Sequence, residues 1–405
     1  MDVLFLSPAF PADMARFTTA LVAAGARVLG VGDTPAVGLP SGLRTSLAGY
    51  LHVPAMLDED DVMARIVAWL GPHRPARIEC NWEVVTLLAA RLRERLDVPG
   101  LSVDTVMGFR DKALMRERVA AAGLAAPRSA RIDTAQAAWD AATNLRWPLV
   151  LKPIAGAGSA DTYIVAGPDD LHNALRKTRH LSEAVLEEFV AGDEYTYDTL
   201  SVAGSPVYES VSQYFPNALD ARSNEWISPI ILTHRTPDAP ELAAGVTLGR
   251  NVNRVLGTGT GASHLEWFRT VTDEAIFGEV GCRTPGAAMV DLMNYAGDHD
   301  VFQGWADVVV HGRTNLQSAR PYYAAATFKR AQGNGRIRAI EGLDRFRARF
   351  ARHIVSVDLL PVGATRRDWR QTFLSDGAIV VRHPEFDACL RMAKIAASEV
   401  HMYAG

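Results

Sequence analysis

A chain of 405 residues is long enough to form one to three domains with sizeable hydrophobic cores. Its hydrophobic content of 48%, charged content of 22% and net charge of −4 are ordinary for a globular protein, and they argue against nucleic-acid binding through overall charge. The cysteines Cys80, Cys282 and Cys389 lack the close spacing of a zinc site or a disulfide framework, so we expect reduced thiols in a cytoplasmic protein.

The N-terminal segment is not typical of a signal peptide, because it begins without basic residues and its apolar run is interrupted at Ser7 and Pro8. The sequence contains no stretch close to the ~18 consecutive apolar residues of a membrane-spanning helix. We therefore expect neither a membrane nor a nucleic acid among the partners of this protein.

Residues 1–105 predict an open α/β domain. Val3–Leu6 and Arg27–Val31 are typical of buried strands on either side of a helix that ends near Gly25, and Asp60–Leu70 has the periodicity of an amphipathic helix. The segment lacks the GxGxxG motif of dinucleotide-binding folds, so we do not expect it to bind NAD.

A candidate substrate-binding residue follows a short strand predicted at Arg77–Cys80. Ligands of open α/β sheets gather at the carboxyl ends of the strands, which here points to Asn81, Trp82 and Glu83. The alternative for Glu83 is an ordinary residue in the first turn of a helix, where the helix dipole favours a carboxylate.

The next motif combines a basic helix, a buried lysine and a glycine-rich segment. The helix is predicted at Asp111–Ala122, and the strand Trp147–Pro153 presents Lys152, which needs an anion if it is buried. Gly156 and Gly158 then allow backbone amides to close around an anion. We favour a phosphate cradle, which includes the hydroxyl donor Ser159; a flexible turn is the alternative.

The strand predicted at Ala184–Val190 ends in a turn. Such a strand can hold a flat heterocycle by its backbone edge, with Phe189 and Val190 as the hinge. Glu194 can then accept hydrogen bonds from ribose hydroxyls. The polar segment Tyr214–Arg235 is predicted to be an irregular covering loop.

Two strands that follow a helix at Gly245–Leu256 predict a hairpin. They are Ser263–Arg269 and Ala275–Cys282, and a turn centred between Thr272 and Asp273 places Glu266 opposite Glu279.

Because like charges directly opposite each other are destabilising, this pairing of glutamates indicates a divalent cation that is shared with substrate phosphates. A solvated hairpin rim is the alternative. The same register places His264 opposite Gly281 and puts Arg283 on the face of Glu279.

After residue 300, helical patterns at Arg320–Gln332 and Glu385–His401 flank three strand-like runs. These runs are Gly335–Ile340, Val355–Leu360 and Ala378–Arg382. We expect a C-terminal α+β cap, to which the sequence assigns no chemistry.

These pieces, in this order, resemble the ATP-grasp superfamily. The matching motifs are DK at 111–112, LKP at 151–153, GAGS at 156–159, EEFVAGDE at 187–194 and HLE with FGEVGCR at 264–283. The resemblance implies an α/β (α+β) protein with an N-terminal domain at 1–105, an ATP-grasp domain at 106–300 made of subdomains 106–190 and 191–300, and the cap at 301–405.

The resemblance also implies roles for individual residues. Lys112 and Lys152 would contact the ATP phosphates, and Arg283, with Lys152, would stabilise the transferring phosphoryl group. Glu194 would bind the ribose, Glu266 and Glu279 would bind magnesium, and Glu83 and His264 remain candidates for substrate contacts. The segment Gly156, Ala157, Gly158 and Ser159 resembles the loop over the phosphates, and Glu187, Phe189 and Val190 resemble the adenine hinge.

One residue departs from the commoner pattern, in which an asparagine two residues after the second metal glutamate also binds the metal. The chain has Gly281 there, so the second magnesium site has lost a protein oxygen. A water, a bidentate Glu279 or the facing His264 can compensate, and a looser second site is the alternative.

The resemblance implies an ATP-dependent carboxylate–amine ligase that forms an amide or peptide-like bond through an acyl phosphate. Its cofactors would be ATP and Mg²⁺, with two ions expected and Mn²⁺ as a substitute. Its partners would be a small carboxylic acid and an amine, and a homodimer is compatible with the sequence. The alternatives are a carboxylase-like or carboxylate–thiol ligase, and an ATP-binding regulator with weak catalysis, for which Gly281 is the main indication.

Overall fold

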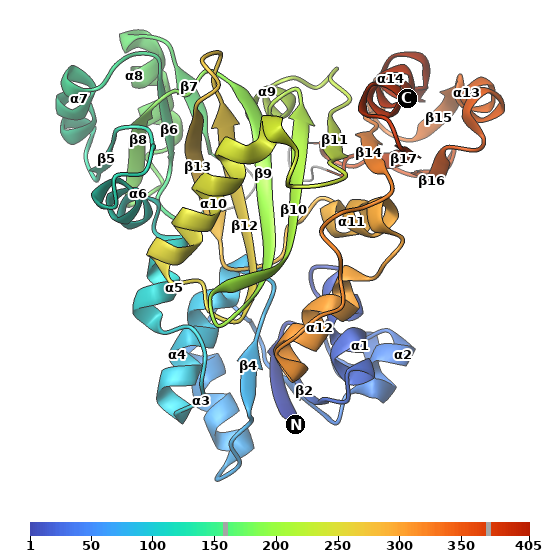
Figure 1. Cartoon of the computed structure of the whole chain (residues 1–405). Helices are drawn as coiled ribbons and strands as arrows, with labels where there is room; N and C mark the ends of the chain where they lie inside the picture. Colours follow the sequence, from blue (N-terminus) through green and yellow to red (C-terminus); the bar gives the residue numbers. More distant parts are fainter. Residues whose placement is uncertain (157–160, 370–373) are drawn as a thin grey trace.

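The computed structural model describes residues 1–156, 161–369 and 374–405. Its N-terminal part is a parallel sheet with the strand order β3-β2-β1-β4, flanked by helices (Figure 1). This arrangement confirms the predicted open α/β layer. The elements are β1 Asp2–Leu6, α1 Met14–Ala23, β2 Arg27–Gly32, α2 Ser41–Ser46, β3 Gly49–His52, α3 Glu59–Leu70, β4 Arg77–Glu79 and α4 Thr86–Leu96.

Two helices, α5 (Val103–Arg110) and α6 (Lys112–Ala121), lead into a small antiparallel sheet with the order β5-β8-β6-β7. The side chain of Asp111 caps α6 by accepting from two backbone amides of its first turn, which fixes where the helix starts. The elements of the small sheet are β5 Ser129–Ile132, α7 Ala135–Asn144, β6 Leu149–Pro153, β7 Tyr163–Val165, α8 Pro168–Lys177 and β8 Ala184–Glu188.

A larger sheet forms the body of the molecule, in the order β13-β12-β9-β10-β11-β14-β17-β16 (Figure 1). Strands β14, β17 and β16 come from the C-terminal segment, so that segment continues the sheet. The domain boundaries stay a prediction. Strands β15 and β18 pair with each other in a separate two-stranded antiparallel sheet. The elements of this part of the chain are β9 Asp193–Val202, β10 Ser205–Phe215, α9 Ala218–Ser223, β11 Ile230–Thr233, α10 Ala243–Leu256, β12 Gly261–Arg269, β13 Ala275–Gly281, α11 Met289–Gly297, α12 Val301–His311, β14 Tyr323–Phe328, β15 Ile337–Glu341, α13 Leu343–Phe350, β16 Ile354–Leu359, β17 Gly377–His383, α14 Phe386–Glu399 and β18 His401–Ala404.

Two predicted elements are wrong. The segment 214–235, expected to be irregular, contains the end of β10, helix α9 and strand β11. The helix expected at Arg320–Gln332 is instead the strand β14, because its apolar residues pair with β11 and β17 in the interior of the large sheet. Tertiary burial overrides a local helical pattern at this position.

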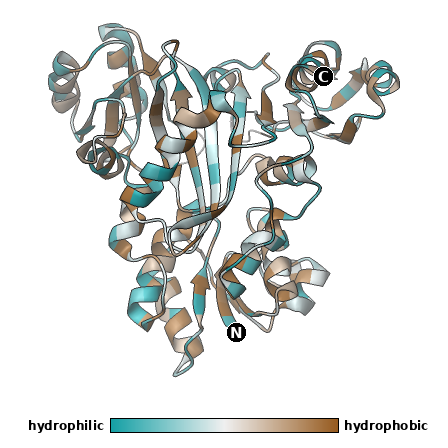
Figure 2. Ribbon diagram, viewed as in Figure 1, coloured by the Kyte–Doolittle hydropathy of each residue, from teal (hydrophilic) through white to brown (hydrophobic). Residues whose placement is uncertain are grey.

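Residue parity assigns opposite roles to the two faces of β9 and β12 in the large sheet. Tyr197 on β9 and Trp267 on β12 lie on the face covered by α10, whereas Asp198 and Glu266 point to the other face. Bands of differing hydropathy along the long strands reflect this alternation (Figure 2). Near α10, one face of β9 and β12 is therefore committed to packing, and the other face presents Asp198 and Glu266 as polar groups.

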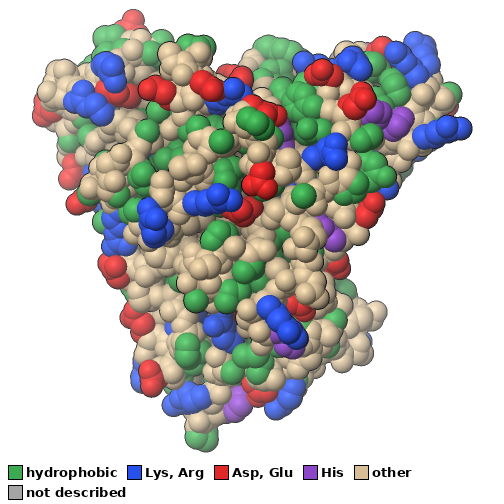
Figure 3. Space-filling model, in the orientation of Figure 1, with side chains coloured by type: hydrophobic (Ala, Val, Ile, Leu, Met, Phe, Trp, Pro, Cys, Tyr) green, Lys and Arg blue, Asp and Glu red, His purple; other side chains and the backbone are tan. Residues whose placement is uncertain are grey.

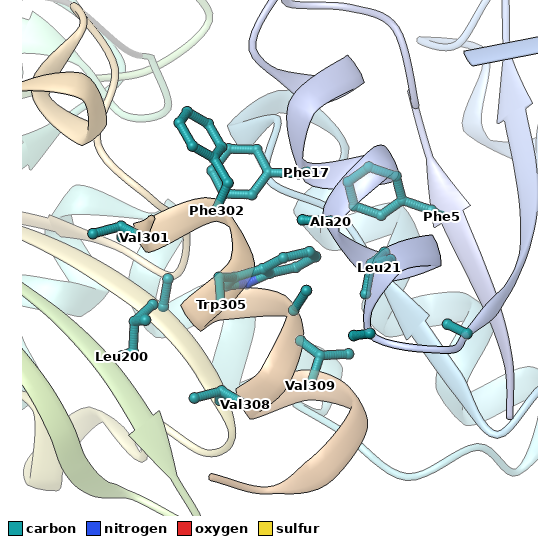
Figure 4. Close-up of a cluster of buried hydrophobic side chains, with 14 of the residues drawn as sticks. Phe5, Phe17, Ala20, Leu21, Leu200, Val301, Phe302, Trp305, Val308 and Val309 are labelled. Atoms are coloured by element: carbon teal, nitrogen blue, oxygen red, sulfur yellow. The ribbon is translucent and has the colours of Figure 1, made fainter. Parts of the chain in front are cut away.

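Helix α12 joins the N-terminal layer to the large sheet. Trp305 packs against Phe5 of β1 and Phe17 of α1, with ring centroids 5.8 and 5.2 Å apart, and Phe302 lies 4.6 Å from Phe17 (Figure 4). Leu200 of β9 belongs to the same buried cluster. This shared core fixes the N-terminal domain against the sheet that carries the polar face.

The surface has charges of both signs. Acidic and basic side chains are interspersed over the visible face of the molecule (Figure 3). Within the part of the chain that the structure describes, no helix is both long enough and apolar enough to span a bilayer.

The contact between α10 and the sheet requires glycine at position 249. A Cβ at Gly249 would lie 2.2 Å from Cδ1 of the buried Tyr197. We predict that Gly249→Ala lowers the free energy of unfolding by about 1–3 kcal/mol, although alanine favours a helix. Gly42→Ala in α2 is the control, because a Cβ there meets nothing within 4 Å. Equal effects in denaturant unfolding would contradict this account of the packing.

Candidate active site

A large pocket opens between the small sheet and the polar face of the large sheet. It gathers most of the described candidate residues from the sequence. Asn81 and Trp82 do not line it, and Ala157, Gly158 and Ser159 lie outside the described residues. The candidates that line the pocket are Glu83, Lys112, Lys152, Gly156, Glu187, Phe189, Val190, Glu194, His264, Glu266, Glu279 and Arg283.

The predicted pairing of the two glutamates in the hairpin is confirmed. Glu266 lies opposite Glu279 and His264 lies opposite Gly281. The predicted turn centre is wrong, because the pairs nearest the turn are centred on Thr272. A bulge then shifts the register between Trp267 and Glu266.

The bulge contains Gly278. A Cβ at this position would lie 2.7 Å from the carbonyl oxygen of Glu266, so a side chain would clash with the neighbouring strand. The glycine therefore allows the bulge, and the bulge brings both carboxylates to the same side of the hairpin.

Cationic side chains from the small sheet and α6 compensate Glu279. Lys112 Nζ lies 2.9 Å from Glu279 Oε1 and donates to the carbonyl oxygen of Gly156 at 3.0 Å. Burial alone would raise the pKa of Glu279, but Lys112 and Lys152 lower it to about 2. Glu279 is thus held as a carboxylate among positive charges.

The carboxylate of Glu187 is held between two buried cations. Lys152 Nζ lies 2.6 Å from its Oε1, and an Arg116 guanidinium nitrogen lies 2.8 Å from its Oε2. Burial opposes ionisation, yet Arg116 and Lys152 keep the pKa of Glu187 below its usual value. Arg116 was missed from the sequence, because its helical position alone does not show which face of α6 meets the small sheet.

The predicted ribose glutamate is positioned by a residue that the sequence did not single out. Glu194 Oε2 accepts from the backbone amide of Ala218 at 2.6 Å, and Asn217 Oδ1 accepts from the backbone amide of Glu194 at 3.0 Å. Burial and the nearby Glu266 raise the pKa of Glu194 to about 8. Residues at the start of α9 therefore fix the position of Glu194 in the lining of the pocket.

Glu83 bridges two arginines from different parts of the chain. Its Oε1 lies 2.7 Å from Arg110 Nη1, and its Oε2 lies 2.6 Å from Arg283 Nη2. Glu83 thus lies in the pocket, as its position after β4 predicts, and the bridge links the N-terminal domain directly to the arginine that follows the hairpin. Arg110 was not predicted, because it pairs with Glu83 only through the tertiary fold.

His264 is buried beside Glu266. Its Nδ1 lies 2.6 Å from Asp198 Oδ1, and its Nε2 lies 3.7 Å from Glu266 Oε1. Burial lowers the pKa of His264, but Asp198 and Glu266 outweigh it and raise the pKa to about 9. Asp198 was not predicted from the sequence.

The donor set fits a divalent cation that is shared with phosphate oxygens. Among the described residues, no group of three or more His, Cys, Asp or Glu side chains is arranged so that it could hold a metal ion without other ligands. Glu266 and Glu279 nevertheless face each other in a pocket that also contains Lys112 and Lys152. Two carboxylates with substrate phosphates are the ligand set that Mg²⁺ commonly takes in nucleotide sites.

Comparison with protein-family models gave no match. The chain is 24% identical over 234 residues to an L-arginine-specific L-amino acid ligase of Bacillus subtilis, which is 56% of this chain and 55% of that protein. It is 26% identical over 303 residues to an alanine–anticapsin ligase of the same species, covering 68% and 64% of the two chains. Among solved structures it is similar to an L-amino acid ligase from Bacillus licheniformis, with a TM-score of 0.78, 19% identity and coverage of 100% and 99%.

The fold is that of the ATP-grasp superfamily, so the predicted resemblance and fold class are confirmed. The alignments span from about half to just under two thirds of the length of the two curated relatives.

The Glu187 bridge gives a prediction about stability. Glu187→Gln would leave Lys152 and Arg116 buried without their shared carboxylate, so we expect the free energy of unfolding to fall by about 3–5 kcal/mol. Glu188→Gln is the matched control, because the neighbouring carboxylate pairs with the exposed Arg146 and Arg128. A loss of no more than about 1 kcal/mol is expected there. Similar losses of unfolding free energy in the two variants would contradict the larger contribution assigned to the buried Glu187 bridge.

Proposed function

We propose that the chain is an ATP-dependent carboxylate–amine ligase acting on small molecules. The observation that carries this proposal is that one pocket brings together the hinge segment, Lys112, Lys152, Arg283 and the opposed carboxylates of the hairpin. Two of the sequence relatives are named as an L-amino acid ligase and an alanine–anticapsin ligase, and these names favour a carboxylate–amine ligase over a carboxylase-like or carboxylate–thiol ligase.

Each group of pocket residues would bind a different part of ATP or the metal ion. Phe189 and Val190 would hold the adenine edge, and Glu194 would accept from the ribose. Lys112 and Lys152 would neutralise the phosphates, which lets an anionic carboxylate approach them. Glu266 and Glu279 would hold Mg²⁺, which supplies charge neutralisation of the phosphates when bound. The proposal also includes two bound Mg²⁺ ions, which Mn²⁺ could replace, and a homodimer of this chain.

The reaction would take place in two steps. A carboxylate oxygen of the acid attacks the γ-phosphorus of ATP, and the bond to the leaving ADP oxygen breaks, which gives an acyl phosphate. The amine nitrogen then attacks the acyl carbon, loses a proton, and inorganic phosphate leaves. Arg283, held by Glu83, would stabilise the charge on the transferred group in both steps.

A matrix of carboxylic acids and amines tests the proposal. Amino acids serve as both components, a set of thiols replaces the amines in a separate arm, and ADP release and product mass are measured. We expect ADP release that requires both an acid and an amine, with a product equal in mass to the pair less water. Nucleotide binding without turnover anywhere in the matrix would favour a regulator, and a product only with thiols would favour the other ligase class.

The metal carboxylates give a second prediction. Glu279→Gln should remove about 2–4 kcal/mol of transition-state stabilisation while the affinity for ADP, measured by calorimetry, changes little. The lysines and the hinge remain, whereas the charge that matters during phosphoryl transfer is lost. A variant that keeps more than about a third of the normal rate at saturating Mg²⁺ would overturn the metal assignment.

Gly281 gives a third prediction. Its backbone lies outside the left-handed region, and a Cβ there would meet only ordinary contacts, the nearest being Arg283 Cγ at 3.5 Å. Gly281→Asn should therefore fold and place an amide oxygen near the second ion, which lowers the Mg²⁺ concentration for half-maximal activity. Thermal stability is measured alongside. A stable variant with an unchanged or higher Mg²⁺ requirement would show that Gly281 is not a vacated ligand position.

A further inference from the structure

A buried acid supports His264 from the adjacent strand. Asp198 on β9 lies directly opposite His264 on β12, and its carboxylate accepts from Nδ1 at 2.6 Å. The second carboxylate oxygen accepts from the Thr196 hydroxyl at 2.7 Å. Thr196 Oγ1 in turn accepts from the backbone amide of Ser212 at 3.2 Å, so the network is anchored to three strands. Asp198 is 2% exposed and Thr196 is fully buried.

This arrangement determines which imidazole nitrogen faces the pocket. Because Nδ1 is hydrogen-bonded to Asp198, Nε2 is the imidazole nitrogen that remains for other partners. It lies 3.7 Å from Glu266 Oε1. That separation is longer than a hydrogen bond. Across the hairpin, the position facing His264 is Gly281, which has no side chain to fill the same space.

The opposite face of the same strands shows what packing alone requires. Thr199 and Ser263, the neighbours of Asp198 and His264, form a neutral hydroxyl pair at 2.7 Å that is equally buried. A buried ionic pair is expensive to desolvate and is often no better for stability than neutral groups of similar size. The acid and imidazole on the pocket face therefore call for a reason beyond packing.

We propose that Asp198 is a positioning residue for the ligase reaction, because it orients His264 so that Nε2 meets an anionic oxygen of the acid substrate or its acyl phosphate in the space beside Gly281. The inference rests on the proposed function. His264 would touch the reacting group, whereas Asp198 acts through His264. A carboxylate behind a functional histidine fixes the orientation of the ring and favours the imidazolium form, in which Nε2 carries the proton that it donates to that oxygen.

The test compares Asp198→Asn with the wild-type chain under the acid and amine conditions that support turnover. The asparagine keeps the size of the side chain and can still accept from Thr196. We expect kcat to fall by about 10- to 100-fold, while the KM for ATP and the affinity for ADP stay within about twofold. In the NMR spectrum, the strongly hydrogen-bonded Nδ1 proton of His264 should disappear.

A double variant adds a readout that a purely structural role would not give. His264→Gln alone should lower kcat to a similar extent, and Asp198→Asn combined with His264→Gln should be no slower than His264→Gln, because the acid acts through the imidazole. His264→Gln also serves if Asp198→Asn fails to fold, since its expected loss of kcat at constant ADP affinity tests the same contact.

Thr199→Val is the matched control. It removes a buried hydrogen bond one residue along the same strand but on the other face, so it should lower stability and leave kcat unchanged. The inference is wrong if Asp198→Asn keeps more than about half of the wild-type kcat, if the two substitutions are additive, or if Thr199→Val lowers kcat equally. Failure of the wild-type chain in the substrate matrix would instead contradict the proposed function.

Discussion

The structure depends on two like charges that face each other across a hairpin. Glu266 and Glu279 are directly opposite, an arrangement that destabilises a strand pair unless cations offset it. Lys112 from α6 meets Glu279, and the protonated form of His264 meets Glu266. The small sheet, the preceding helices and the large sheet are therefore arranged around a cluster in which each acid has a positive neighbour, and a cation shared with phosphates would fit between the two acids.

The N-terminal domain takes part in this arrangement through one polar bridge and one apolar core. Glu83 links Arg110 to Arg283, and α12 packs Trp305 against Phe5 and Phe17. The apolar core fixes the domain, and the bridge then sets the position of the guanidinium in the pocket. A domain that bears no phosphate-binding motif of its own thereby contributes to the geometry of the proposed transfer site.

The local sequence pattern was enough to predict the hairpin, the strand that carries Lys152 and the N-terminal α/β layer. These elements are marked by alternating apolar residues and by turn residues within a few positions of each other. The pairing of Glu266 with Glu279 was predicted correctly although the turn centre was not, since a bulge at Gly278 offsets the error. Arg110, Arg116 and Asp198 were missed because each acquires its role from a partner that lies far away in the sequence. Strand β14 was mistaken for a helix because burial in the sheet interior decides its conformation.

Isotope transfer tests the central claim most directly. The acid substrate is labelled with ¹⁸O in its carboxylate, the ligase reaction is run with ATP and the amine, and inorganic phosphate and nucleotide are examined by mass spectrometry. An acyl phosphate formed in this pocket predicts that one labelled oxygen passes from the acid to inorganic phosphate for each amide formed. Amide formation with unlabelled phosphate, or with the label in AMP, would contradict the account.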